Sequence, residues 1–132
     1  MRWILAAAVT EQARFGLGGE MPLLIKMNGK PVVVVSGVGT APKLATADWY
    51  KNRKPGAWEN PSQMPPIPGE GIHAAILPGV FDGLMLALQQ YGTKSFAEVA
   101  APAIEYADQF PIGEEFSTFI RNGERLLSSW PT

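Results

Sequence analysis

The chain has 132 residues, with 11 basic and 12 acidic side chains, a net charge of −1 and 46% hydrophobic residues. This balance excludes the basic excess that draws proteins to nucleic acid or anionic lipid, and the apolar content argues against disorder. The absence of cysteine excludes disulfides and thiolate metal sites. We therefore expect no nucleic acid, no membrane, no metal and no cofactor among its partners.

The N-terminal segment is rich in good helix formers, and residues 3–13 predict a helix. The same apolar run imitates a very short signal peptide, because Ala6 and Ala8 have the spacing of a cleavage site. A buried helix and a leader are the two interpretations of this segment. The run is too short to span a bilayer.

A β-hairpin is predicted next. The apolar segments 22–27 and 31–36 flank Asn28-Gly29, the strongest short hairpin signal in a sequence. Four consecutive valines, Val32 to Val35, make the second strand continuously apolar, which is typical of a strand covered on both faces.

The middle of the chain contains little regular structure. A short helical turn is predicted at 47–51. Residues 52–70 contain five prolines and predict a long surface loop. The segment 71–76 is interpreted as a short strand.

Three helices follow. Residues 80–91 carry an apolar stripe at helical spacing. The second helix opens at Ser95-Phe96-Ala97-Glu98, a capping box, and contains Pro102, which predicts a kink. Its expected buried face is made of Phe96, Val99, Ala100, Ala103, Ile104 and Ala107. The third helix, at 113–128, has acids near its start and arginines near its end, which suits the helix dipole.

The order helix, β-hairpin, Pro-rich loop, short strand and three helices predicts an α+β fold, as part of an αββα layer stack. Two or three strands make a thin sheet for this much helix. We therefore expect residues 1–132 to form a single partial domain whose folded unit needs more chain.

A spaced set of residues carries a family resemblance. It is similar to the large subunit of the γ-glutamyltransferase family, where a Pro-Gly helix start, a Tyr-Gly-Thr turn and a Pro-Ala-Ile helix follow one another. The first third agrees, because Gly16-Leu17-Gly18-Gly19 resembles the start of the family's Gly-rich turn. The matching residues of the later segment are Pro78-Gly79, Gly83-Leu84, Ala87, Tyr91-Gly92-Thr93, Phe96, Val99, Pro102-Ala103-Ile104, Ala107 and Phe110.

The resemblance implies an N-terminal-nucleophile (Ntn) hydrolase that cleaves itself once. In such enzymes the new N-terminal threonine of the small subunit attacks a γ-glutamyl amide such as glutathione, and the acyl group then passes to water or an amino acid. None of this chain's threonines stands in the family's processing motif. We therefore expect a fragment without a catalytic residue, whose partners are the rest of the large subunit, the small subunit and a small amide or peptide substrate.

The substrate residues depart from the family pattern. The family's second strand ends Asp-Gly-Arg-Glu, and its arginine holds the substrate α-carboxylate. Here Val38 stands in place of that arginine and Gly39 in place of the glutamate. The resemblance implies ligand-facing backbone at Gly37, Val38 and Gly39, with Gly18 and Gly19 second. Two interpretations of this departure stay open: the chain belongs to a relative that acts on a different acyl group, or to an inactive relative.

Other patterns favour plain structural roles. The glycines after Ser36 invite a dinucleotide site, but Pro42 occupies the place of the third glycine. His73, the only histidine, lacks the spacing of a triad or a metal cluster and is interpreted as a strand-end residue with a backbone partner. The leading hypothesis is an amide-cleaving enzyme fragment, and the alternative is a non-catalytic scaffold that binds a partner chain.

Overall fold

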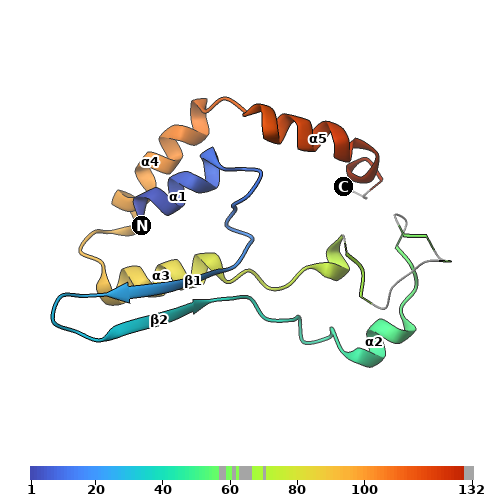
Figure 1. Cartoon of the computed structure of the whole chain (residues 1–132), viewed down its shortest axis with the longest axis horizontal. Helices are drawn as coiled ribbons and strands as arrows, with labels where there is room; N and C mark the ends of the chain where they lie inside the picture. Colours follow the sequence, from blue (N-terminus) through green and yellow to red (C-terminus); the bar gives the residue numbers. More distant parts are fainter. Residues whose placement is uncertain (57–58, 61, 63–66, 70, 130–132) are drawn as a thin grey trace. The chain divides into compact units, whose positions relative to one another are not determined.

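A computed structural model describes residues 1–56, 59–60, 62, 67–69 and 71–129 (Figure 1). The parts of the predicted loop at 57–58, 61, 63–66 and 70 lie outside the described residues. The α+β class is confirmed. The elements in chain order are α1 (Arg2–Thr10), β1 (Met21–Lys26), β2 (Val32–Gly37), α2 (Ala47–Asn52), the 3₁₀ helix η1 (Ile72–Ala74), α3 (Val80–Tyr91), α4 (Phe96–Gln109) and α5 (Glu114–Leu127).

The described chain divides into two compact units. Unit 1 comprises Met1–Thr40 and Pro78–Gly113, and unit 2 comprises Ala41–Leu77 and Glu114–Thr132. The expectation of one partial domain stays a prediction. Among the described residues, none of the helices has the length and apolar character needed to cross a membrane.

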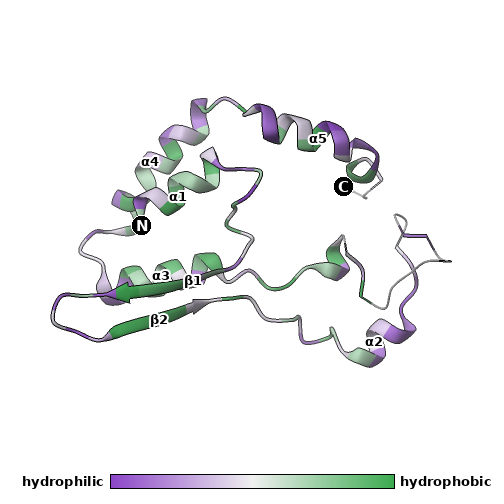
Figure 2. Ribbon diagram, in the orientation of Figure 1, coloured by the Kyte–Doolittle hydropathy of each residue, from purple (hydrophilic) through white to green (hydrophobic). Residues whose placement is uncertain are grey.

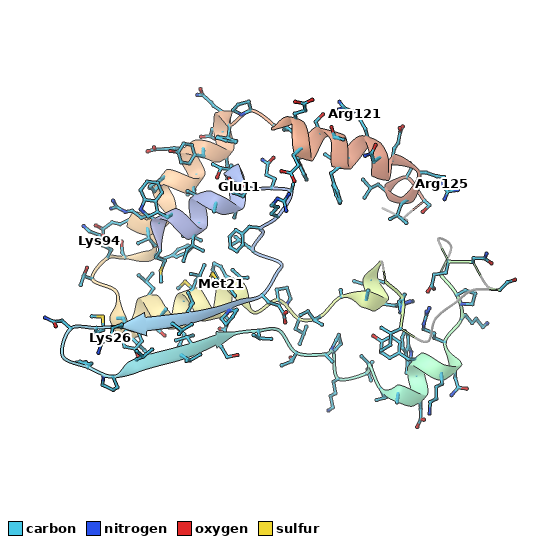
Figure 3. All side chains as sticks on the ribbon, viewed as in Figure 1. Glu11, Met21, Lys26, Lys94, Arg121 and Arg125 are labelled. Carbon is cyan, nitrogen blue, oxygen red and sulfur yellow. The ribbon has the colours of Figure 1, made fainter. Side chains whose placement is uncertain are left out.

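The hairpin forms as predicted, one residue away from the expected strand bounds. β1 and β2 pair antiparallel, with Met21 opposite Gly37 and Lys26 opposite Val32, and Figure 3 labels both ends of β1. Gly29 adopts φ +70°, and the Lys30 amide donates to the Met27 carbonyl at 3.1 Å. Glycine at this turn position accepts the positive φ without steric cost.

The hydrophobic core of unit 1 is built from residues of α1, α3 and α4. α3 packs against both strands, and α1 packs beside α4 (Figure 1). Val80 is fully buried, and Leu84 is 2% exposed. The predicted stripe on α3 supplies half of this core, which joins Leu5, Val80, Leu84, Leu88, Val99 and Ala100.

The described residues cover only one face of the hairpin. Val35 is buried against α3, whereas Leu24, Val32 and Val34 are 75%, 55% and 64% exposed. Figure 2 shows the apolar colouring that runs along both strands. Alternate side chains of a strand point to opposite faces, so one layer of helix buries only one set. Cover on the second face stays a prediction.

The capping box of α4 is confirmed. The Ser95 hydroxyl accepts from the Glu98 amide, and the Glu98 carboxylate accepts from the Ser95 amide at 2.9 Å. The expected buried face is wrong at three positions: Val99 and Ala100 are buried and Ala103 is half-buried, but Phe96 and Ile104 are 41% and 61% exposed and Ala107 is also exposed. For Ile104 and Ala107 the reason is length, because α1 has 9 residues and covers only part of the 14-residue α4. α1 itself ends at Thr10, earlier than predicted, and turns follow it.

In unit 2 the strand expected at 71–76 is wrong. The segment is η1, in which the Ala74 amide donates to the Gly71 carbonyl at 3.0 Å and the Ala75 amide to the Ile72 carbonyl at 3.2 Å. A strand needs a partner for its backbone groups, and the sheet of the described residues consists of β1 and β2 without a third strand. Local 3₁₀ bonds satisfy these groups instead. His73 therefore lies in a 3₁₀ turn, although its carbonyl does have a partner, the Tyr50 hydroxyl.

α2 and α5 agree with their predictions. Thr46 caps α2, since its hydroxyl accepts from the Trp49 amide at 3.2 Å. α5 begins with Glu114 and Glu115 and has Arg125 in its last turn, the charge order that a helix dipole favours. α5 carries both hydrophilic and hydrophobic residues along its length (Figure 2).

Candidate functional site

The predicted ligand-facing residues gather at one end of the hairpin. Gly18 and Gly19 precede β1, Gly37 closes β2, and Val38 and Gly39 follow it. Met21 and Gly37 are opposite one another in the register, so the entry to β1 and the exit from β2 are adjacent. The hairpin thus brings the two glycine-containing segments together.

The start of α3 closes this end. The Gly19 carbonyl accepts from the amides of Gly79 and Val80, each at 3.2 Å. These amides belong to the helix start, where backbone donors lack partners within the helix. The Gly-rich turn therefore serves as a backbone cap for α3 and fixes where the helix begins.

Three glycines allow α3 to approach β2 closely. A β-carbon on Gly79 would lie 2.5 Å from the Gly37 carbonyl oxygen, and one on Gly83 would lie 2.9 Å from the Gly37 α-carbon. A β-carbon on Gly37 would meet the Met21 carbonyl oxygen. Gly37 is buried, so its role within this chain is close packing beneath α3.

The structure adds a residue to the site that the sequence did not identify as functional. The Gly39 amide donates to Glu20 Oε1 at 3.0 Å. Glu20 follows Gly18 and Gly19 directly in the chain. Its carboxylate places a negative charge at the strand exit, while the Val38 side chain is 47% exposed and carries no charge. An anionic group of a ligand would meet repulsion here rather than a positive clamp.

The sequence contained a partial signal for these contacts. Gly79 and Gly83 are four residues apart, which places them on one face of a helix. That spacing indicates that the helix approaches another segment closely, but it does not indicate which segment. The contact between Glu20 and Gly39 depends on the hairpin register, which brings residues 19 positions apart together.

A second polar feature lies in unit 2. Arg53 forms a bidentate ion pair with Glu59, with both N···O distances 2.6 Å, and the Gly56 amide donates to the same carboxylate at 2.6 Å. The hydrogen bonds from Arg53, and next that from Gly56, lower the pKa of Glu59 to about 2. No sequence pattern indicates this pair, because the two residues lie in a Pro-rich loop without periodicity.

The antiparallel hairpin, packed against α3 and closed at a glycine-containing end, defines an α+β fold. A family model described as gamma-glutamyltranspeptidase matches residues 3–132. The chain therefore belongs to the γ-glutamyltranspeptidase family.

Individual relatives agree with this assignment. The chain is 34% identical over 119 residues to the glutathione hydrolase-like YwrD proenzyme of Bacillus subtilis (strain 168), covering 88% of this chain and 21% of that protein. It is 32% identical over 107 residues to the acylase ACY 1 proenzyme of Pseudomonas sp. (strain V22), covering 80% of this chain and 19% of that protein. The chain thus spans about one fifth of the length of these relatives.

A solved structure has the same fold. The crystal structure of Helicobacter pylori gamma-glutamyltranspeptidase superimposes with a TM-score of 0.72 at 23% identity. The match covers 96% of this chain and 35% of that one. The helix, hairpin and helix order described above is therefore an arrangement found in a solved member of the family.

Proposed function

We propose that this chain is part of the large subunit of an enzyme that hydrolyses or transfers a γ-glutamyl or other acyl group from an amide. The observation that carries the proposal is the family match over residues 3–132. In this proposal the chain supplies core and substrate-wall structure. The nucleophile and the small subunit are contributed by other parts of the protein, so the 132 residues alone are inactive.

The hairpin end is the proposed substrate wall. Val38 and Gly39 face the ligand, Gly18 and Gly19 stand next to them, and Gly37 supports the wall by allowing α3 to approach. The support for this role is the adjacency of the two segments at one end of the hairpin and the exposure of Val38.

The acyl group is the finer part of the proposal. A γ-glutamyl group carries an α-carboxylate, and an arginine is the usual bidentate partner for a carboxylate. This chain has Val38 at that position and the Glu20 carboxylate on the Gly39 amide at 3.0 Å. We therefore expect an acyl group without an α-carboxylate to be preferred over γ-glutamyl.

The test uses the longest natural polypeptide that contains this sequence, together with the 132-residue chain alone. Hydrolysis of γ-glutamyl p-nitroanilide and of butyryl p-nitroanilide is measured for both. We expect activity only in the longer protein, with the higher kcat/KM for the butyryl compound. Activity of neither protein on either compound would favour the non-catalytic scaffold.

A substitution tests the role of Val38. In the longer protein, Val38→Arg should shift the ratio of kcat/KM values toward γ-glutamyl by about tenfold to hundredfold, the range expected for a partly exposed charged pair. Val38→Met is the matched control, because it lengthens the side chain without adding charge, and should leave the ratio within about twofold. An unchanged ratio in Val38→Arg would remove this position from the substrate wall.

A further inference from the structure

Unit 2 contains a pocket of its own. It lies between α2 and η1 and has a volume of about 240 Å³. Its lining residues include Leu44, Trp49, Tyr50, Ile72, His73 and Ala75. Leu44 and Ile72, which are 80% and 74% exposed, leave the pocket open to a ligand from solvent.

The pocket walls are held by specific contacts. The Tyr50 hydroxyl donates to the His73 carbonyl at 2.7 Å and so ties α2 to η1. The Trp49 ring lies edge-on to both neighbours, with ring centroids 4.9 Å from Tyr50 and 5.0 Å from His73. Edge-to-face rings prefer this geometry, so three rings form a connected wall.

The charge of the pocket selects for a neutral ligand. None of its lining residues is Asp, Glu, Lys or Arg. Arg53 and Glu59 of unit 2 pair with each other through two bonds of 2.6 Å. Other charged residues adjoin lining residues in the chain without lining the pocket themselves, namely Lys43, Asp48 and Lys51. Tyr50 and His73 are the ionisable side chains in the lining. An ion entering this space would lose water without meeting an Asp, Glu, Lys or Arg side chain in the pocket wall, which costs free energy.

The volume sets the size of the ligand. An apolar cavity of about 150 Å³ holds benzene, whereas sites for drug-sized molecules occupy roughly 300–1,000 Å³. The 240 Å³ here lies between these limits. It has room for one ring with a short substituent, and an aromatic ring can continue the edge-to-face pattern of the wall.

We propose that this pocket binds a neutral small molecule that carries one aromatic ring. The inference rests on unit 2 alone and does not depend on the proposed acyl transfer. Phenylacetamide is a suitable probe, because it has one ring and a short uncharged amide. Phenylacetate is its matched anionic counterpart.

The experiment is a saturation-transfer NMR titration of phenylacetamide on the 132-residue chain, a method that also works if the chain self-associates. We expect a Kd of about 1 mM, in line with the affinity of a ligand of this size. Phenylacetate should bind at least about tenfold more weakly, because of its charge. No binding of phenylacetamide, or equal binding of both compounds, would overturn the proposal.

Variants locate the binding. Ala75→Leu fills the pocket and should raise the Kd at least about tenfold, whereas Ala101→Leu, on the exposed side of α4 in unit 1, should leave the Kd unchanged. If far-UV circular dichroism shows that Ala75→Leu does not fold, Trp49→Ala replaces it as the pocket variant in the titration, because this substitution removes the central ring of the wall. Undiminished binding to the folded pocket variant would show that the ligand binds elsewhere and refute the proposal.

Discussion

The close packing of α3 on β2 predicts the outcome of one substitution, Gly83→Ala. In an exposed helix interior, alanine is more stable than glycine by about 1 kcal/mol, because it restricts the unfolded chain. At position 83 the added β-carbon would lie 2.9 Å from the Gly37 α-carbon and 3.9 Å from Val35 Cγ1. The nearest atom belongs to backbone, which cannot rotate away as the end of a flexible side chain can.

The magnitude follows from these two opposing effects. Overpacking a well-filled contact typically costs 1–3 kcal/mol, and a backbone neighbour places the cost at about 2–3 kcal/mol. Subtracting the gain of about 1 kcal/mol from helix propensity leaves a net loss of about 1–2 kcal/mol in the free energy of unfolding.

The assay is urea unfolding followed by far-UV circular dichroism. Leu86→Ala and Leu86→Gly provide the matched reference, because position 86 lies in the middle of the same helix and is 41% exposed. There the alanine variant should be the more stable by about 1 kcal/mol. If Gly83→Ala gains stability as alanine does at position 86, the close approach of α3 to β2 is refuted.

Two further predictions concern local polar contacts. Ser95→Ala removes the hydroxyl that caps α4 and should lower the free energy of unfolding by about 1 kcal/mol, while the exposed Thr93→Ala should change it by less than about 0.5 kcal/mol. The pKa of Glu59 is about 2 in the folded chain and 4.5 ordinarily, so its stabilising contribution is complete above pH 4.5 and is lost as the pH falls through 2. The Gly56 amide proton should report this by NMR with a midpoint near pH 2, and Glu59→Gln should abolish the transition. A midpoint near 4.5 would mean that the Arg53–Glu59 pair does not form.

The local elements were largely predictable. Asn28-Gly29 specified the hairpin, and Ser95 with Glu98 specified the start of α4, because each depends on residues within a few positions of one another. The departure at Val38 was visible as well, since it needed only an aligned motif. The buried face of α4 was half wrong, and toward its C-terminal end the error arose because cover depends on the length of another helix, α1, and not on the periodicity of α4 itself.

The sequence by itself determined the family, the hairpin, the helix starts and the glycine-containing segments that meet at the hairpin end. Only the tertiary structure decided how those segments are used: Gly37 beneath α3, the Gly19 carbonyl on the α3 amides, and Glu20 on the Gly39 amide. It also decided that residues 72–74 form a 3₁₀ turn and that Arg53 pairs with Glu59. The physical reason for the contacts at the hairpin end is range, since capping and turn chemistry act between neighbours in the chain, whereas the close packing of α3 and the contact of Glu20 with Gly39 join residues that only the folded backbone brings together. The 3₁₀ turn and the Arg53–Glu59 pair are local in sequence, but no hydrophobic periodicity marks either of them.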